Sequence, residues 1–359
     1  MPSSVYIFAV SFTDIIFKNL QSQSSEKRRE ERSMDMAADI DFVRFKGLQE
    51  RARNDVLPKL DHEDVGTEPE NDGKVKDDDD DVWNVEEETR REGVGFGARK
   101  SMKKRRISHG FHLVEGKMDH GMEDYLVAEN RRMNGHDLGL YAIFDGHSGH
   151  KVAEYLRTHL FDNILKEHEF WENPVSAIKQ AYKVTDDYIL ENVVGARGGS
   201  TALTAILVDQ RQLVVANVGD SRAILSRNGK AKQITVDHDP LKRKEKKMVE
   251  RKGGFVAKKP NTRNVPRVDG QLAMTRAFGD AQLKEHITVE PDVVIERIGK
   301  ETQFIVLASD GLWKVMSNKG VVDCVREFNN GEDGARGLID TALSRGSKDD
   351  ISCVVVKLE

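Results

Sequence analysis

Two apolar runs in this sequence each end in an aspartate followed by a glycine. The run Leu140–Phe144 leads into Asp145, and the run Phe304–Ser309 leads into Asp310. Apolar runs of this length are typical of buried strands, and a glycine marks the turn that follows. Two such strands could bring two carboxylates together at one sheet edge. Asp-Gly is also ordinary turn chemistry, so neither copy identifies a site by itself.

Further acids stand at turns or strand ends elsewhere in the chain, and one histidine follows the first aspartate by two residues. The set is Glu123, Asp124, Asp145, Asp220, Asp310 and Asp349, with His147. Carboxylate oxygens suit hard cations such as Mg²⁺ and Mn²⁺ and do not suit zinc. Because a cluster of like charges is tolerable only where a metal neutralises it, the pattern predicts a divalent-metal site.

The segments around the first acids predict strands and helices in turn. Residues 107–114 and the segment that follows Asp124 resemble a strand pair. Adjacent residues of a strand point to opposite faces, so one of Glu123 and Asp124 faces inward or lies at a bulge. Helical spacing predicts a helix over about 150–166, and Asn173-Pro174 is typical of the start of a second helix.

The middle of the chain is rich in β-forming residues. Three runs with short connections cover residues 201–208, 212–218 and 222–226, and Asn228-Gly229 predicts a tight hairpin into residues 232–236. Strands joined without a helix between them are antiparallel, which excludes a doubly wound parallel sheet. The sequence therefore favours antiparallel sheets covered by helices.

The remaining elements follow in a simple order. A lysine-rich helix is expected from Asp239-Pro240 to the glycines at 253–254, and then an irregular segment over 255–275. The last part predicts the strand before Asp310, a helix opened by Ser317, a helix near 334–345 and a final strand over 351–358. His238 and His286 show no ligand spacing, so we expect ordinary surface or loop histidines. Gly198-Gly199 reads as a tight turn.

Composition excludes several classes of protein. The chain has 359 residues, of which 38% are hydrophobic and 33% charged, so a soluble domain with a sizeable core is expected. Its net charge of -5 gives no general attraction to nucleic acid. The apolar run 5–17 is too short for a membrane span. Two cysteines argue against a disulfide framework and fit a reducing compartment, so we expect a cytoplasmic or nuclear protein.

The first hundred residues differ from the rest. They hold few apolar residues, the acidic run Asp77–Asp81 and further acids at 86–88, so residues 1–100 are predicted to be a largely disordered extension. A basic cluster over 99–106 follows, which is typical of a solvated charge run or of a nuclear-import signal. Residues 101–359 are expected to form the folded domain.

Taken together, the motifs resemble a known enzyme family. The stretches that carry the resemblance are Met122–Asp124, Phe144–Gly149, Gly198–Ala202, Asn217–Ala223, Arg267–Ala273, Thr275–Asp280, Ala308–Trp313 and Lys348–Asp350. In this order they are similar to the metal-dependent serine/threonine protein phosphatases of type 2C, particularly plant members. The resemblance implies an α+β fold in which a central β-sandwich of two antiparallel sheets is flanked by α-helices, in four αββα layers. It also implies phosphoprotein substrates, and we expect a monomer.

The resemblance assigns roles to the acids. It implies two Mg²⁺ or Mn²⁺ ions per catalytic domain, with Asp145 bridging both and the carbonyl of Gly146 binding one. It implies that Asp310 and Asp349 complete the second ion and that His147 is the general acid. Further positions matching the family's metal centre are Glu123 and Asp124, directly or through water, and Asp220, at a third and weaker ion.

One position departs from the family pattern. Four residues before Glu123, where relatives commonly carry a phosphate-binding arginine, the chain has Asp119. Lys117 lies two residues earlier, and in an extended strand it would project from the same face, so it is a candidate to contact the substrate phosphate. The alternative is that Lys117 is an exposed turn lysine and the metals alone hold the phosphate.

Rival functions can be compared with the same residues. A cysteine-dependent phosphatase requires an arginine six residues after its cysteine, but Asn330 follows Cys324 at that spacing and Glu359 follows Cys353. A haloacid-dehalogenase-type phosphatase requires an aspartate where this chain has His147. A catalytically silent type-2C fold that acts as a binding scaffold is the remaining alternative.

Overall fold

The structure, a computed structural model, describes residues 105–193, 198–258 and 265–359. The predicted disorder of residues 1–100 and the basic cluster up to residue 104 lie outside these ranges. Within the described ranges, no helix is both long enough and apolar enough to cross a membrane.

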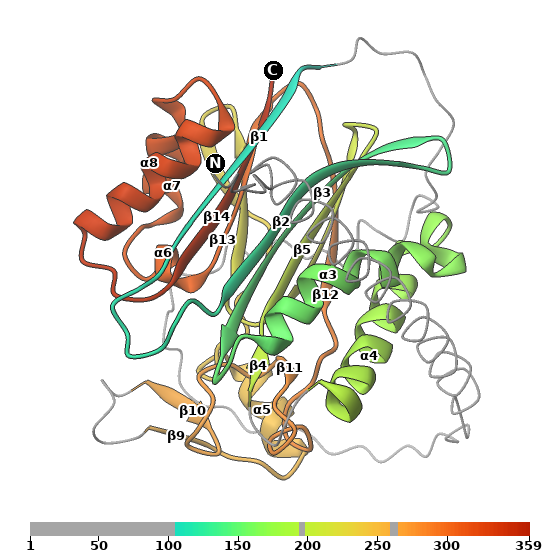
Figure 1. Ribbon diagram of the computed structural model, residues 1–359, viewed down its shortest axis with the longest axis vertical. Coiled ribbons are helices and arrows are strands. Elements are labelled where there is room, and N and C mark those ends of the chain that lie inside the picture. Colours follow the sequence, from blue (N-terminus) through green and yellow to red (C-terminus); the bar gives the residue numbers. More distant parts are fainter. Residues whose placement is uncertain (1–104, 194–197, 259–264) are drawn as a thin grey trace, which may run out of the picture. The chain divides into compact units, whose positions relative to one another are not determined.

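Two antiparallel sheets form the centre of the fold (Figure 1). The first sheet has the order β1-β14-β13-β7-β8, with bounds Ile107–Val114, Ile351–Leu358, Thr302–Ala308, Arg222–Arg227 and Lys230–Gln233. The second has the order β11-β4-β3-β5-β6-β12, with bounds Phe278–Gly279, Gly199–Ser200, His136–His147, Ala202–Val208, Gln212–Val218 and Asp292–Arg297. In this sheet β2 (Asp124–Met133) also pairs with β3.

Helices cover the outer face of each sheet. On the second sheet lie α3 (Lys151–Lys166), the short η1 (His168–Trp171) and α4 (Pro174–Asn192). On the first sheet lie α6 (Asp310–Trp313), α7 (Asn318–Arg326) and α8 (Gly331–Ser344). The expected arrangement of a β-sandwich flanked by helices is therefore confirmed.

Apolar layers lie on both faces of the strands, because successive side chains of a strand point to opposite faces. In β3, Leu140 and Phe144 pack with the α3 and α4 side chains, whereas Tyr141 and Ile143 pack with side chains of the first sheet. A third layer joins the outer face of the first sheet to α7 and α8. Successive residues of a strand point to opposite faces, so a continuous apolar run is what a strand buried on both sides needs.

Several helix starts and turns were predicted correctly from local sequence. Asn173 caps α4, because its side chain accepts a hydrogen bond from the Ser176 N–H (3.2 Å), and Ser317 caps α7 through the Gly320 N–H (3.1 Å). The Asn228-Gly229 turn joins β7 to β8, and both turn residues have the positive φ that this hairpin requires. The last strand has the predicted bounds.

Other predictions about the elements were wrong. β1 does not pair with β2, since β1 pairs with β14 in the first sheet and β2 pairs with β3 in the second. The chain crosses from one sheet to the other between these strands, and local sequence carries no signal of such distant partners. β8 also ends at Gln233, three residues before the predicted end of that strand.

Two further segments differ from expectation. Helix α5 spans Arg243–Arg251, because Asp239 instead closes a turn by accepting the Leu241 N–H (2.7 Å). The segment expected to be irregular contains β9 (Val256–Lys258) and β10 (Pro266–Val268), which pair with each other. Gly199 belongs to β4, which pairs with β3 and β11, so this pair of glycines is not simply a turn.

Arg105 joins the two sheets at one end of the sandwich. Its main-chain N–H donates to the side chain of Gln210 (3.0 Å), in the connection between β5 and β6 of the second sheet. Its guanidinium donates to the carbonyls of Gly299 (2.9 Å) and Thr302 (2.8 Å), and to that of Leu358, at the β13 and β14 ends of the first sheet. One side chain thus donates to all three of these carbonyls.

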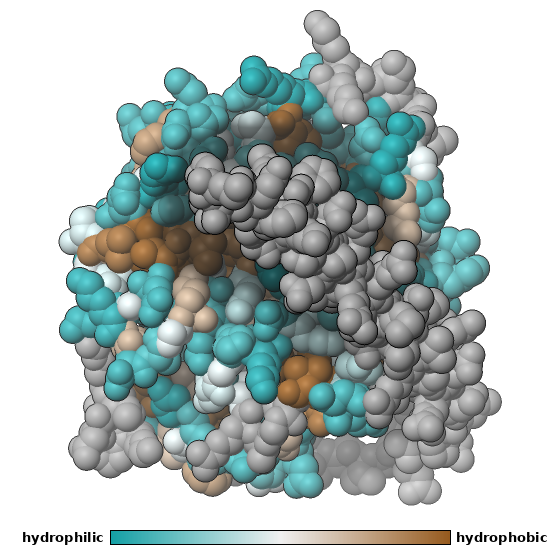
Figure 2. All heavy atoms as spheres, viewed as in Figure 1, coloured by the Kyte–Doolittle hydropathy of each residue, from teal (hydrophilic) through white to brown (hydrophobic). Residues whose placement is uncertain are grey.

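The face drawn in Figure 2 is mainly hydrophilic, with separate apolar patches. Phe111 and Leu113 of β1 are two of the large apolar side chains that are more than a third exposed. The others come from separate segments: Met118, Val236, Leu241, Phe255, Val265 and Leu343. Scattered apolar exposure of this kind is normal on a soluble protein.

β1 packs closely against the start of α8 at Gly110, so a substitution of this glycine tests that contact. A Cβ at this position would lie 2.1 Å from the Glu332 main-chain nitrogen. Gly110→Ala should therefore lower the free energy of unfolding by about 2 kcal/mol or more and Tm by roughly 4–8 °C, measured by thermal denaturation. Gly121→Ala is the matched control, because a Cβ there meets nothing within 4 Å. Equal Tm values for both variants would contradict this packing.

Candidate metal centre

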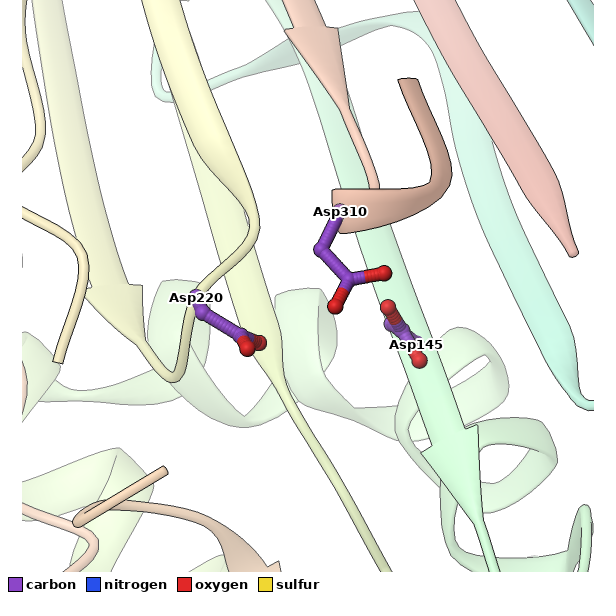
Figure 3. Close-up of side chains that lie close together, drawn as sticks. All are labelled: Asp145, Asp220 and Asp310. Carbon is purple, nitrogen blue, oxygen red and sulfur yellow. The ribbon is translucent and has the colours of Figure 1, made fainter. Parts of the chain in front are cut away.

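Three aspartates from three different segments converge at one end of the sandwich. Asp145 lies near the end of β3, Asp220 in the connection from β6 to β7, and Asp310 at the start of α6 (Figure 3). One carboxylate oxygen from each lies within 4.8 Å of the other two. Asp145 lies on a strand of the second sheet, Asp310 follows a strand of the first, and Asp220 lies in a connection from the second sheet to the first, so the cluster spans the sandwich. Asp145 and Asp310 therefore come together as expected, but at the ends of strands from two different sheets rather than at one sheet edge.

Main-chain hydrogen bonds fix Asp145 with its carboxylate facing this cluster. Its N–H donates to the Thr201 hydroxyl (3.0 Å), and its carbonyl accepts from the Thr201 N–H (2.9 Å). The Thr201 hydroxyl lies 2.9 Å from that of Ser221, next to Asp220. The strand that follows the glycines at 198–199 therefore holds two of the three acids in place.

Glu123 and Asp124 have different surroundings. Asp124 is opposite Asp145 in the β2–β3 register, is only 2% exposed, and accepts a hydrogen bond from the Ser352 hydroxyl (2.7 Å). The expectation that one of the two acids faces inward is met by Asp124. The carboxylate of Glu123 instead accepts the Gly149 N–H (2.6 Å) and so holds the turn after β3.

Gly146 lies where two backbones meet. Its N–H donates to the Glu123 carbonyl (3.2 Å), and a Cβ at Gly146 would lie 2.6 Å from that same oxygen. A larger residue would therefore push β3 away from the start of β2. This explains why glycine follows Asp145, while metal binding by the Gly146 carbonyl stays a prediction.

Asp349 is linked to Asp310 by an ion pair that each forms with the same lysine, Lys314, which the sequence analysis did not single out. Lys314 places its ammonium 2.5 Å from Asp310 Oδ2 and 2.8 Å from Asp349 Oδ2. The spacing of Asp310 and Lys314 could have indicated this pair, because residues four apart on a helical turn are neighbours. Asp350, the next residue, accepts the main-chain N–H of Gly116 (2.7 Å) and holds that segment against the cluster.

Burial and mutual repulsion make these acids hard to ionise without a cation. Burial, together with the charges of neighbouring carboxylates, raises the pKa of Asp124 and of Asp220 to about 7. Burial, followed by the charges of Asp124 and Asp310, raises the pKa of Asp145 well above its ordinary value. Within the described residues, Asp220 Oδ1 is buried without a hydrogen-bond partner. An all-oxygen cluster with an unsatisfied buried oxygen fits a hard divalent cation.

His147 lies beside the cluster and pairs with an acid that was not singled out from the sequence. Its Nε2 is 2.7 Å from Asp280 Oδ2, and the imidazole is 22% exposed. Burial alone would lower the pKa of His147, but the hydrogen bond and charge of Asp280 outweigh it and raise the pKa above its usual value. Asp280 is the last residue of the Thr275–Asp280 motif, and its place in that motif could have identified it as a functional residue.

His238 lies in a loop between β8 and α5, as expected, but it is not at the surface. It is fully buried, its Nδ1 accepts the Gly219 N–H (3.0 Å), and its Nε2 lies 3.2 Å from Asp292 Oδ2. The imidazole therefore positions the loop that presents Asp220. His286 is partly buried, and its Nδ1 lies 2.5 Å from Asp269 Oδ2.

Lys117 is exposed and lies in a bend at 117–120, so the argument from an extended strand does not apply to it. Its main-chain N–H donates to the Lys348 carbonyl (2.7 Å), directly before Asp349. Its contact with a substrate phosphate stays a prediction.

Comparison with known proteins agrees with this geometry. The sequence model described as "Protein phosphatase 2C" matches residues 112–351. The chain belongs to the protein phosphatase 2C family. By homology it is therefore a metal-dependent serine/threonine protein phosphatase, as the resemblance of its motifs implied.

Relatives support the assignment, and a solved structure shares the fold. The chain is 64% identical to "Probable protein phosphatase 2C 28" of Arabidopsis thaliana, over 70% of this chain and 74% of that protein. It is 58% identical to "Probable protein phosphatase 2C 62" of Oryza sativa subsp. japonica, over 70% and 87%. The fold matches that of "serine-threonine phosphatase 2C from Toxoplasma gondii" with a TM-score of 0.61 at 22% identity, over 72% of this chain and 96% of that one.

The raised pKa values predict how pH controls stabilisation of the phosphatase by metal. A carboxyl whose pKa is about 7 when folded and about 4 when unfolded contributes stability below pH 4, and that stability is lost as pH rises through 7. The rise in Tm that Mn²⁺ produces over chelator should therefore increase between about pH 5 and pH 8. Thermal denaturation across this range is the measurement, and Asp220→Asn should flatten the dependence. A rise in Tm that is independent of pH would contradict the assignment.

Proposed function

We propose that this phosphatase hydrolyses phosphoserine and phosphothreonine with a pair of Mg²⁺ or Mn²⁺ ions held by the acidic cluster. The observation that supports the proposal is the convergence of Asp145, Asp220 and Asp310 within 4.8 Å. In this proposal Asp145 would help hold both ions, the carbonyl of Gly146 would help hold one, and Asp310 and Asp349 would help hold the other. Glu123 and Asp124 would act directly or through water, and Asp220 would help hold a third, weaker ion.

The bound ions would lower the pKa of water and offset negative charge on the phosphoryl oxygens. The chain itself supplies the proton. His147 in its protonated form would donate to the serine or threonine oxygen, which otherwise leaves as a poor alkoxide. Asp280 orients the imidazole through Nε2 (2.7 Å) and favours the protonated form by its charge.

Substrate phosphate has a candidate contact at Lys117. The bend at 117–120 is hydrogen-bonded to the segment that leads into Asp349, and the Lys117 side chain is exposed to solvent. Asp119, also exposed on this bend, would repel a phosphate dianion. A lysine offers a single point of charge rather than the planar fork of an arginine, so the phosphate would be held less tightly.

A first experiment separates an active phosphatase from the silent scaffold. We expect phosphate release from a phosphothreonine peptide with Mn²⁺ or Mg²⁺ and none with chelator. Asp145→Asn should lower turnover by about 100-fold or more, because the centre loses an anionic ligand. Asp323→Asn, an exposed residue paired with Lys319 on α7, is the control and should leave turnover unchanged. Activity that survives chelation would contradict the metal mechanism.

The pairing of His147 with Asp280 predicts a change in the pH profile. A general acid must be protonated, so turnover falls as pH rises through the pKa of His147. Asp280→Asn removes the charge that raises this pKa, and the fall in turnover should begin at a lower pH than in the wild type. Steady-state kinetics against pH is the measurement. Asp269→Asn, which alters the separate pair with His286, is the matched control; identical profiles for Asp280→Asn and wild type would remove Asp280 from the mechanism.

A further inference from the structure

The ammonium of Lys314 lies between two carboxylates that the proposed function assigns to metal. It is 2.5 Å from Asp310 Oδ2 and 2.8 Å from Asp349 Oδ2. In the described parts of the chain, no other ammonium or guanidinium nitrogen pairs with either carboxylate within 4.0 Å. Lys314 therefore supplies the positive charge at this edge of the cluster.

The position of Lys314 follows from a single helical turn. Its main-chain N–H donates to the Asp310 carbonyl (2.9 Å), which places the two side chains on the same face, four residues apart. The turn is fixed by its neighbour Trp313, whose indole N–H donates to the Ala308 carbonyl (2.9 Å). Arg222, whose guanidinium lies 5.1 Å from the centroid of the Trp313 ring, is paired with Asp237, so its charge is already balanced.

A lysine and a divalent cation compete for the same oxygens here. Asp310 and Asp349 offer their Oδ2 atoms to the ammonium, and a metal bound by those atoms would face a positive charge at hydrogen-bond distance. The lysine side chain is 55% exposed, so it has room to swing into solvent. Its two ion pairs would then be lost when metal binds.

We propose that Lys314 is a tethered cation that occupies the Asp310–Asp349 edge of the metal-free centre and that metal must displace to bind. The proposal rests on the assignment of Asp310 and Asp349 as metal ligands. It makes Lys314 a determinant of metal affinity: the side chain stabilises the cluster when metal is absent and weakens the binding of metal. Partly exposed ion pairs are individually weak, so two of them together correspond to a roughly three- to tenfold effect on Kd.

The test is Mn²⁺ binding to the metal-free full chain, with free Mn²⁺ followed by electron paramagnetic resonance. Lys314→Gln should bind Mn²⁺ roughly three- to tenfold more tightly than wild type, and Lys314→Met should do the same. Lys314→Arg keeps the charge and should not gain affinity. Lys319→Gln is the matched control, because Lys319 forms the same kind of pair, four residues apart, with Asp323 (2.6 Å) on α7. Its Kd should stay at the wild-type value.

Stability gives a second readout that does not require turnover. Without metal, Lys314→Gln should have a lower Tm than wild type, because the carboxylates lose their counter-charge. Saturating Mn²⁺ should raise its Tm by more than it raises that of the wild type. A Kd for both Lys314→Gln and Lys314→Met that equals or exceeds the wild-type Kd would overturn the proposal.

One more variant separates this proposal from the proposed function. Asp310→Asn should weaken Mn²⁺ binding in the same assay. If wild type and Asp310→Asn bind alike, the metal assignment itself fails, and the role of Lys314 fails with it. If Asp310→Asn loses affinity while both Lys314 variants match wild type, the metal centre stands and only the tethered cation is wrong.

Discussion

Repulsion among carboxylates at one end of the sandwich is the constraint on which the rest of this structure depends. Burial and neighbouring negative charge raise the pKa of Asp124, Asp145 and Asp220, which shows that the fold gathers these groups against their electrostatic preference. The large apolar layers on both faces of the two sheets offset this cost. A protein that keeps such a cluster gives up stability for a site that attracts cations.

The surrounding polar groups hold the acids in position while leaving their oxygens available. Thr201 bonds the backbone of Asp145, His238 bonds the backbone of Gly219 beside Asp220, and Ser352 donates to Asp124. Two of these three contacts therefore use main-chain atoms. Asp280 positions the His147 ring through one hydrogen bond, and that bond and its charge raise the pKa of the imidazole.

Sequence reasoning succeeded at several local signals, although the one at Asp239 misplaced the start of α5, and it failed where the partners are distant in sequence. The strand into Asp145, the cap at Asn173 and the last strand follow from apolar runs and capping chemistry, and the motif order led to the family. The pairing of β1 with β14 could not be foreseen, since the partners are more than two hundred residues apart. The burial of His238 and its bond to Gly219 depend on a tertiary contact that no spacing reveals.

The hydrogen bonds of Arg105 close the end of the sandwich that lies opposite the acidic cluster. Arg105 ties the second sheet, through Gln210, to the ends of β13 and β14 in the first. The seven residues of β13 span roughly 23 Å, so this tie and the acidic cluster lie at opposite ends of the layer between the sheets. Breaking the Arg105 hydrogen bonds would open one end of that layer to solvent. Amide hydrogens of the central strands β5 and β13 should exchange on the timescale of that opening rather than of local fraying.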